Sequence, residues 1–161
     1  MKGGNNIEEN TRNKYVASCS FGKDSIATIL LALENNEPLD EIAYCKVMFD
    51  KTTSGEVPEH EDFIQTKAIP FMEKNGLKVN ILCQQDKNYI TEFMHVVKRG
   101  KWVGHIKGFP LCGRCNISRD LKLPPILKYQ KSLAENTKSY VGIAYDEQER
   151  LLRLKAGSVL S

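Results

Sequence analysis

The chain has no apolar run that approaches the ~20 residues needed to span a lipid bilayer. Its N-terminal stretch, residues 1–13, is polar and rich in Gly and Asn, and it lacks the apolar segment of a secretory signal. We therefore expect residues 1–13 to form a flexible tail on a cytoplasmic protein that makes no contact with a membrane. Internal repeats are missing too, and residues 14–161 are expected to form one domain.

The five cysteines are odd in number and do not suggest a disulfide framework. Cys19, Cys45 and Cys83 fall in or at the end of expected strands, which indicates buried free thiols in a reducing compartment. Cys112 and Cys115 form the single Cys-x-x-Cys, so no second pair completes a zinc or iron–sulfur site. We interpret these two first as reduced loop cysteines, then as metal ligands, and third as a disulfide-forming pair.

Acidic residues are almost absent from one segment. Between Lys98 and Lys131, Asp120 is the only acid against nine basic residues, whereas residues 1–97 contain ten basic and fifteen acidic residues. Such an excess suits an anionic partner, namely a nucleotide or nucleic acid, or else forms a solvated basic surface. Trp102 lies in this segment; we expect a partly buried loop anchor, with stacking on a base as the alternative.

Apolar patterning alternates between strands and helices along the chain. This order predicts an α/β three-layer sandwich with a mainly parallel sheet, whose ligand lies beyond the carboxyl ends of the strands. That edge would carry Ser20–Ser25, Asp50, Gln84–Asp86 and Asp146–Glu147. The expected strands are 15–19, 42–49, 77–83 and 140–144. The expected helices are 25–36, 59–75 with a break or kink at Pro70, 88–99, and 116–131 with an interruption at Pro124-Pro125.

The segment Ser20-Phe21-Gly22-Lys23-Asp24-Ser25 joins the first strand to the first helix. Backbone N–H groups at a helix N-terminus, together with the helix dipole, favour a bound phosphate. Gly22 allows close approach of the backbone, Lys23 adds a mobile positive charge, and the hydroxyls of Ser20 and Ser25 can donate. The segment is not a Walker loop, because the Gly that this motif requires before its Gly-Lys pair is missing.

This segment resembles the PP-loop of the adenine-nucleotide alpha hydrolase superfamily, in particular its phosphoadenosine-phosphosulfate (PAPS) reductase-like branch. Three weaker similarities lie further along: Asp50 after the second strand, Arg119-Asp120-Leu121-Lys122 before a proline, and Gly142-Ile143-Ala144 followed by Arg150. Ala144 stands where the family has Arg. The resemblance spans most of residues 15–154 and implies a HUP or Rossmann-like fold.

The resemblance also implies the site. It suggests ATP or a PAPS-like sulfonucleotide as the ligand, with Mg²⁺ as the accompanying ion. Two chemistries follow: sulfonucleotide reduction, with Cys112, Cys115 or a thiol-donor protein as the reductant, and adenylyl transfer with release of pyrophosphate. The candidate catalytic residues are Lys23, Asp24 and Ser25, and the candidate nucleotide-binding residues are Ser20, Phe21, Gly22, Lys23, Ser25, Asp50, Arg119, Lys122, Gly142 and Arg150; zinc or iron–sulfur would bind Cys112 and Cys115.

The reductases that this chain resembles carry a nucleophilic Cys in a C-terminal tail, and here no Cys follows Cys115. We therefore expect the chain to be either a truncated or minimal relative of these reductases, or a protein that carries out a different reaction at the same nucleotide-binding loop. The alternative function is a non-catalytic module that binds a nucleotide or, through residues 98–131, nucleic acid, as a phage or mobile element would use. The sequence does not indicate an oligomeric state.

Overall fold

The computed structural model of the chain describes residues 13–109, 115–133, 136–143, 152 and 158–160. Five strands form one sheet in the order β3-β2-β1-β4-β5, and every neighbouring pair is parallel. The predicted α/β class with a mainly parallel sheet is confirmed, and the arrangement is Rossmann-like. The strands are β1 (Lys14–Cys19), β2 (Glu41–Lys46), β3 (Lys78–Cys83), β4 (Thr137–Val141) and β5 (Ser158–Leu160).

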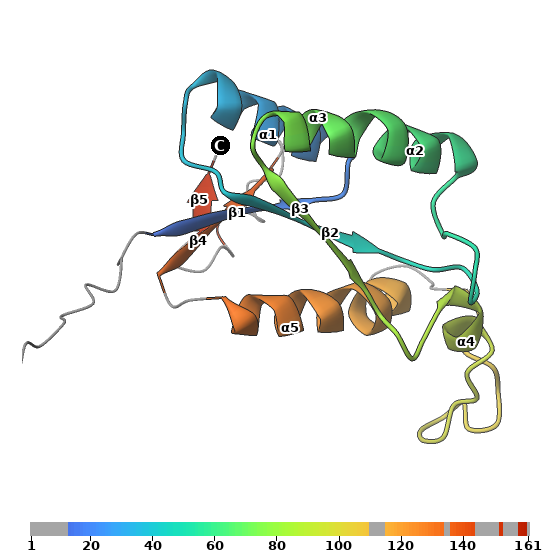
Figure 1. The fold of residues 1–161 in the computed structure, drawn as a ribbon. Coiled ribbons are helices and arrows are strands. Elements are labelled where there is room, and N and C mark those ends of the chain that lie inside the picture. The colour runs from blue at the N-terminus through green and yellow to red at the C-terminus, as the bar shows by residue number, and fades with distance from the viewer. Residues whose placement is uncertain (1–12, 110–114, 134–135, 144–151, 153–157, 161) are drawn as a thin grey trace, which may run out of the picture.

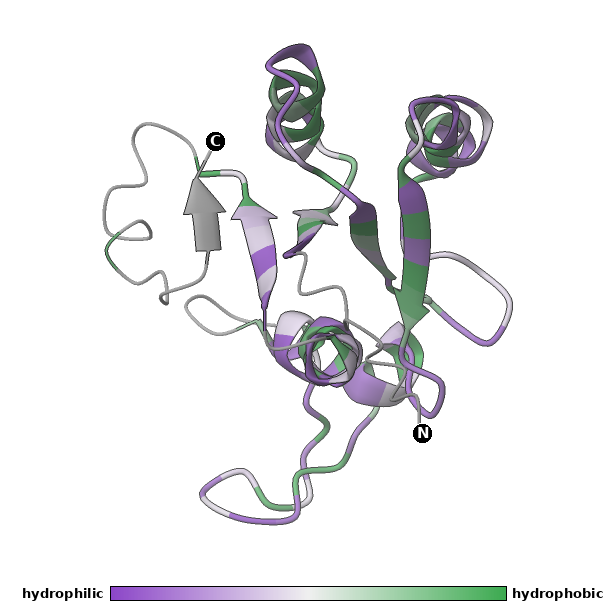
Figure 2. Cartoon of the chain, turned by 60° about the vertical axis from the view of Figure 1, so that its left-hand side comes forward, coloured by the Kyte–Doolittle hydropathy of each residue, from purple (hydrophilic) through white to green (hydrophobic). Residues whose placement is uncertain are grey.

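Helices cover both faces of the sheet (Figure 1). The stretch α2–η1–α3 lies beside α1 over one face, and α5 lies against the other face, with α4 near its end (Figures 1 and 2). Two of the helical segments, η1 and η2, are π-helical turns. The bounds are α1 (Lys23–Glu34), α2 (Pro58–Phe63), η1 (Ile64–Ala68), α3 (Ile69–Lys74), α4 (Tyr89–Phe93), η2 (Ser118–Lys122) and α5 (Leu123–Ser132).

The core lies around the two central strands. β2 is an almost continuous apolar run, as expected for a strand that is covered on both faces, and Ile42 and Tyr44 are 0% and 1% exposed. Against them pack Ile29 from α1 and Ile64 and Met72 from the α2–α3 stretch. Burial on both faces fixes the position of β1 and β2, whose ends carry the site.

Both π-helical turns lie shortly before a proline. η1 precedes Pro70 in α3, and η2 precedes Pro124-Pro125 in α5. Proline has no N–H and its ring crowds the carbonyl of the preceding helical turn, and a wider turn leaves room for it. The predicted interruption at Pro124-Pro125 is therefore wrong, and of the break or kink predicted at Pro70 the break is wrong, because each helical stretch continues through its proline.

Two other expectations are corrected. The helix predicted over 88–99 ends at Phe93, and the chain then forms a hairpin closed by an antiparallel bridge between Val96 and Ile106. The strand predicted over 140–144 is β4, and it is not the last one, because β5 pairs with it at Tyr140↔Val159. A three-residue strand has too little periodicity to be recognised without its partner.

Glu41 joins β1, β3 and α5 at the amino end of β2, opposite the ligand-binding edge. Its buried carboxylate accepts hydrogen bonds from Tyr129 at 2.6 Å and Asn80 at 2.9 Å, and it pairs with Lys14 at 2.8 Å. Burial would raise the pKa of Glu41, but the contacts with Lys14, Tyr129 and Asn80 outweigh it and lower the pKa to about 2. This network fixes α5 over the sheet.

Candidate functional site

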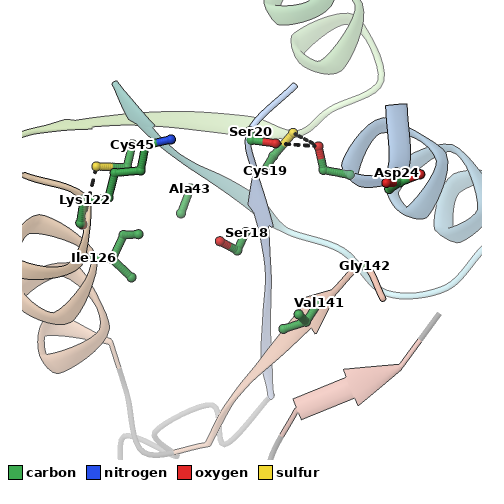
Figure 3. Close-up of a pocket in the computed structure, with 11 residues that line it drawn as sticks. Ser18, Cys19, Ser20, Asp24, Ala43, Cys45, Lys122, Ile126, Val141 and Gly142 are labelled. Atoms are coloured by element: carbon green, nitrogen blue, oxygen red, sulfur yellow. Dashed lines mark hydrogen bonds between the residues drawn. The ribbon is translucent and has the colours of Figure 1, made fainter. Parts of the chain in front are cut away.

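A cavity of about 300 Å³ lies at the carboxyl ends of β1, β2 and β4. β2 lies on one side of β1 and β4 on the other, so this is the topological switch point at which open parallel sheets bind ligands. Figure 3 shows side chains from the start of α1 on one side of the cavity, with Cys45 and Lys122 on the other. The lining residues are Ser18, Cys19, Ser20, Asp24, Ser25, Ala43, Cys45, Lys122, Ile126, Val141 and Gly142.

The loop that enters the cavity turns at a strained residue. Phe21 has φ +57°, a left-handed conformation that bulky side chains rarely adopt. Its ring is 2% exposed and packs edge-on against Tyr44, with ring centroids 5.0 Å apart. Core packing therefore holds a backbone conformation that is unfavourable by itself, which is a common feature of ligand-binding loops.

α1 begins at the cavity with free backbone donors. Gly22 is its N-cap and provides no side-chain cap. Within the described part of the chain, the N–H groups of Lys23, Asp24 and Ser25 have no hydrogen-bond acceptor. These N–H groups and the positive end of the helix dipole form a site suited to an anion.

Hydroxyl and thiol groups surround these donors. The Ser25 hydroxyl donates to the carbonyl of Gly22 at 3.0 Å, and its oxygen lies 3.4 Å from that of Ser20 and 3.5 Å from the Cys19 sulfur. Burial raises the pKa of the Cys19 thiol, and it raises the pKa of Cys45 to about 11. Both thiols are therefore protonated at neutral pH and are poor nucleophiles.

Gly142 is required by a close approach of β4 to α1. A Cβ at this position would lie 2.7 Å from the Thr28 hydroxyl oxygen and 3.3 Å from the carbonyl oxygen of Asp24. Thr28 in turn donates to that carbonyl at 2.9 Å. The absence of a side chain at Gly142 thus lets the first turn of α1 lie against the end of β4.

His60 is a residue of the site that the sequence analysis missed. Its position in α2 suggested an exposed helix start, but its Nε2 lies 3.2 Å from the carbonyl oxygen of Phe21. Its Nδ1 lies 3.0 Å from a carboxylate oxygen of Glu56. Both neighbours are acceptors, so both bonds form only when the imidazole carries two protons. The one signal in the sequence was the Glu56/His60 spacing of four residues.

The ring of His60 titrates accordingly. The hydrogen bond to Glu56, followed by the one to the Phe21 carbonyl, raises the pKa of His60 above its usual value. A raised pKa means that the stabilisation is complete below about pH 6.5 and is lost as pH rises through the folded-state pKa. We expect the stability difference between the wild type and His60→Phe to decrease over that interval.

Urea unfolding at several pH values measures this difference. His60→Phe retains a flat ring that can stack on Phe63, whose centroid lies 6.3 Å away, and it removes only the two polar contacts. Groups that titrate alike in both proteins contribute equally to the pH dependence of their stabilities, so this contribution cancels in the difference. A difference that stays constant as pH rises would contradict the assignment of a proton-dependent contact to His60.

The structure brings most of the predicted loop residues together. Ser20, Asp24, Ser25, Lys122 and Gly142 line the cavity, and Phe21 and Gly22 shape the loop. The side chain of Lys23 is 92% exposed and lies 3.2 Å from the Asp24 carboxylate, so it points to solvent and does not line the cavity.

Asp50 lies elsewhere. Its carboxylate accepts hydrogen bonds from the backbone N–H groups of Thr52 at 2.8 Å and Thr53 at 2.7 Å, which lower its pKa. The Asp50 carboxylate therefore stabilises the turn formed by the residues that follow it. Asp50 and Gln84 line a second cavity of about 390 Å³ near the ends of β2 and β3.

The other candidate residues either do not line the cavity or lie outside the described residues. Arg119 donates to Asp120 at 2.7 and 2.8 Å and is not among the residues that line the cavity. Cys115 is exposed, and its sulfur accepts from the N–H of Ser118 at 3.4 Å. Cys112, Ala144, Asp146–Glu147 and Arg150 lie outside the described residues.

No group of three or more His, Cys, Asp and Glu side chains among the described residues is arranged to hold a metal ion. No helix in the same part of the chain has the length and apolar character to cross a membrane.

Fold and cavity together define the class: an α/β protein with a parallel, Rossmann-like sheet and an anion-favouring cavity at its switch point. Comparison of the chain with models of protein families, with curated proteins and with solved structures found no match.

Proposed function

We propose that this chain is a PP-loop protein similar to the PAPS reductase-like family and that it binds an adenine nucleotide in the switch-point cavity. The observation that carries the proposal is the convergence there of the first-turn N–H groups of α1 with the hydroxyls of Ser20 and Ser25. Phosphate oxygens accept hydrogen bonds from such donors and are attracted by the helix dipole.

The charges around the cavity favour ATP accompanied by Mg²⁺. Asp24 lines the cavity at the first turn of α1, with a largely exposed carboxylate that also pairs with Lys23 at 3.2 Å, and Lys122 lines the cavity from the opposite side. A carboxylate next to a polyphosphate is repelled unless a divalent cation reduces the repulsion, and Mg²⁺ in proteins is typically held by a carboxylate and phosphate oxygens. Asp24 is thus the residue that would hold Mg²⁺, and Lys122 would attract the nucleotide directly.

Adenylyl transfer fits these groups better than reduction by a thiol of the cavity. In this reaction an acceptor forms a bond to the α-phosphorus, the bond from that phosphorus to the bridging oxygen breaks, and pyrophosphate leaves with the electron pair. The N–H groups of α1 and the Lys122 ammonium can stabilise the charge that develops. Cys19 and Cys45 are held protonated by burial, so reduction of a sulfonucleotide would need a thiol from Cys112 or Cys115 or from a donor protein.

Calorimetric titration tests the proposal with ATP, PAPS and adenosine 3′,5′-bisphosphate, each with and without Mg²⁺. We expect ATP to bind in a Mg²⁺-dependent manner. Ser25→Asp places a second carboxylate among the phosphate donors and should weaken binding about a hundredfold or more, because juxtaposed like charges cost several kcal/mol. Ser118→Asp is the matched control, since it adds the same charge to η2, at a residue that does not line the cavity.

The titration also separates the alternatives. Mg²⁺-independent binding of PAPS that is lost in Ser25→Asp would favour sulfonucleotide reduction with an external thiol. If none of the three nucleotides binds, or if Ser25→Asp binds as well as Ser118→Asp, the nucleotide site is disproved. The non-catalytic interaction module then becomes the better description of the chain.

A further inference from the structure

Residues 94–109, hereafter the basic hairpin, project from the body of the protein after α4 (Figures 1 and 2). The two arms are joined by hydrogen bonds from the Val97 N–H to the His105 carbonyl at 2.9 Å and from the Gly104 N–H to the Val97 carbonyl at 3.0 Å. Gly100 and Gly104 have φ of +86° and +85°, which favours glycine in the turns at the tip. The tip therefore has a defined turn geometry although it is far from the core.

The tip of the basic hairpin carries uncompensated positive charge. Lys98, Arg99 and Lys101 are exposed and make no ion pair with any described residue. Residues 94–109 contain no Asp or Glu. Lys107, at the base of the hairpin, is by contrast neutralised by Glu92 and Asp120. Within the part of the chain that the structure describes, the charge is thus compensated at the base and not at the tip, which suits the three cations to an anionic partner.

An aromatic ring lies among these cations. Trp102 is 61% exposed, so the expectation of a partly buried anchor is wrong. The Lys101 ammonium lies 5.0 Å from the centroid of its ring, and His105 packs perpendicular to it at 5.8 Å. The Lys101 ammonium thus lies over the indole ring, while most of the surface of Trp102 still faces solvent.

We propose that the basic hairpin binds single-stranded nucleic acid, with Trp102 stacking on a base and Lys98, Arg99 and Lys101 facing the backbone phosphates. An unpaired base offers a free face on which the indole can stack, and the phosphate next to that base can then pair with a neighbouring cation such as Lys101. A duplex hides that face. A lipid surface fits less well, because insertion of the indole would carry the Lys101 ammonium toward the hydrocarbon.

This surface is separate from the nucleotide cavity. No residue of the basic hairpin lines that cavity, and the hairpin packs at α4 and η2 through Lys107. The inference thus goes beyond the proposed function and stands on different residues. We expect single-stranded nucleic acid to bind equally well when the nucleotide cavity carries Ser25→Asp.

Trp102 is the only Trp of the chain, so its fluorescence reports on the tip alone. The full chain is titrated with a labelled oligothymidylate of about 16 nucleotides, near the upper site size of single-strand binding folds. We expect quenching of the indole and a rise in anisotropy of the label. Trp102→Ala should weaken binding about tenfold or more, because base stacking contributes roughly 1–3 kcal/mol, whereas Trp102→Phe should keep much of the affinity.

Salt dependence tests the cations. The double variant Lys98→Ala/Arg99→Ala should reduce the slope of log K against log salt by about 1.4, since each phosphate contact of a single strand contributes about 0.7. The matched control is Lys67→Ala/Lys74→Ala, which removes two exposed cations from the η1–α3 stretch. Far-UV circular dichroism verifies that each variant is folded.

Three results would overturn the inference. Duplex DNA could bind as tightly as the single strand without quenching the indole, which would indicate only nonspecific charge attraction. Vesicles with anionic lipids could bind and shift the indole emission to the blue while the oligonucleotide does not bind, which would indicate a membrane surface. Absence of binding, or an unchanged affinity in Trp102→Ala, would equally remove the proposed role of the hairpin.

Discussion

Gly142→Ala should destabilise the protein by about 1–3 kcal/mol and weaken nucleotide binding at least tenfold. The new Cβ would lie 2.7 Å from the Thr28 hydroxyl oxygen and 3.3 Å from the Asp24 carbonyl oxygen. The hydroxyl can rotate away, but the carbonyl belongs to the helix backbone and moves only with the first turn of α1. That turn carries the N–H groups proposed to hold phosphate, so the substitution affects stability and binding together.

Two further variants make this result specific. Thr28→Ala removes the nearest atom, and in that background Gly142→Ala should cost less than in the wild type, which a double-mutant cycle measures by urea unfolding. Gly76→Ala is the control for a lost glycine, because its Cβ meets nothing within 4 Å and its φ of +80° alone causes strain. Gly76→Ala should lower stability without changing nucleotide affinity. Full stability and affinity in Gly142→Ala would show that the close approach of β4 to α1 is unimportant.

Lys107→Met should lower the free energy of unfolding by about 3 kcal/mol, because it removes one partner of a buried charge network. The Lys107 ammonium lies 2.5 Å from Glu92 and 2.9 Å from Asp120. Glu92 is 3% exposed, and among the described residues its carboxylate would keep, without Lys107, the ion pair with Lys87 at 3.1 Å. The variant thus leaves a buried carboxylate insufficiently compensated and releases the base of the hairpin from η2.

Urea unfolding of matched variants measures this effect. Lys98→Met makes the same substitution in the same hairpin at an exposed residue, and its stability should stay within about 0.5 kcal/mol of the wild type. The double variant Lys107→Met/Glu92→Leu removes both charges and should recover part of the loss, because an apolar pair carries no uncompensated charge. Equal stabilities of Lys107→Met and Lys98→Met would mean that the network does not stabilise the fold.

Local patterns determined a large part of this protein. Short-range periodicity predicted the strand, loop and helix around Ser20–Ser25. It also predicted three further strands along the chain, and their alternation with helices predicted a parallel sheet. The burial of Cys19 and Cys45 was predicted in the same way, from their places in apolar strands of a covered sheet, whereas Cys83, predicted to be buried with them, is only partly buried in the strand β3. These features depend on neighbours within a few residues, and the sequence contains them directly.

Tertiary structure decided which distant residues share the site. Lys122 reaches the cavity from the end of η2, about a hundred residues after the loop it faces, whereas Asp50 turns back on its own backbone and Lys23 points to solvent. The contact of His60 with the Phe21 carbonyl depends on how α2 packs over the sheet. No local pattern records such distances, because they result from the packing of whole elements.

The hairpin illustrates the same division. The sequence determined that residues 94–109 carry cations and no acids, and that one Trp lies among them. Only the folded chain decided that Lys107 is neutralised at the base, while Lys98, Arg99 and Lys101 pair with no acid of the described residues and lie near an exposed Trp102. Charge is a property of the residues themselves, whereas its compensation depends on which groups the fold brings within a few ångströms.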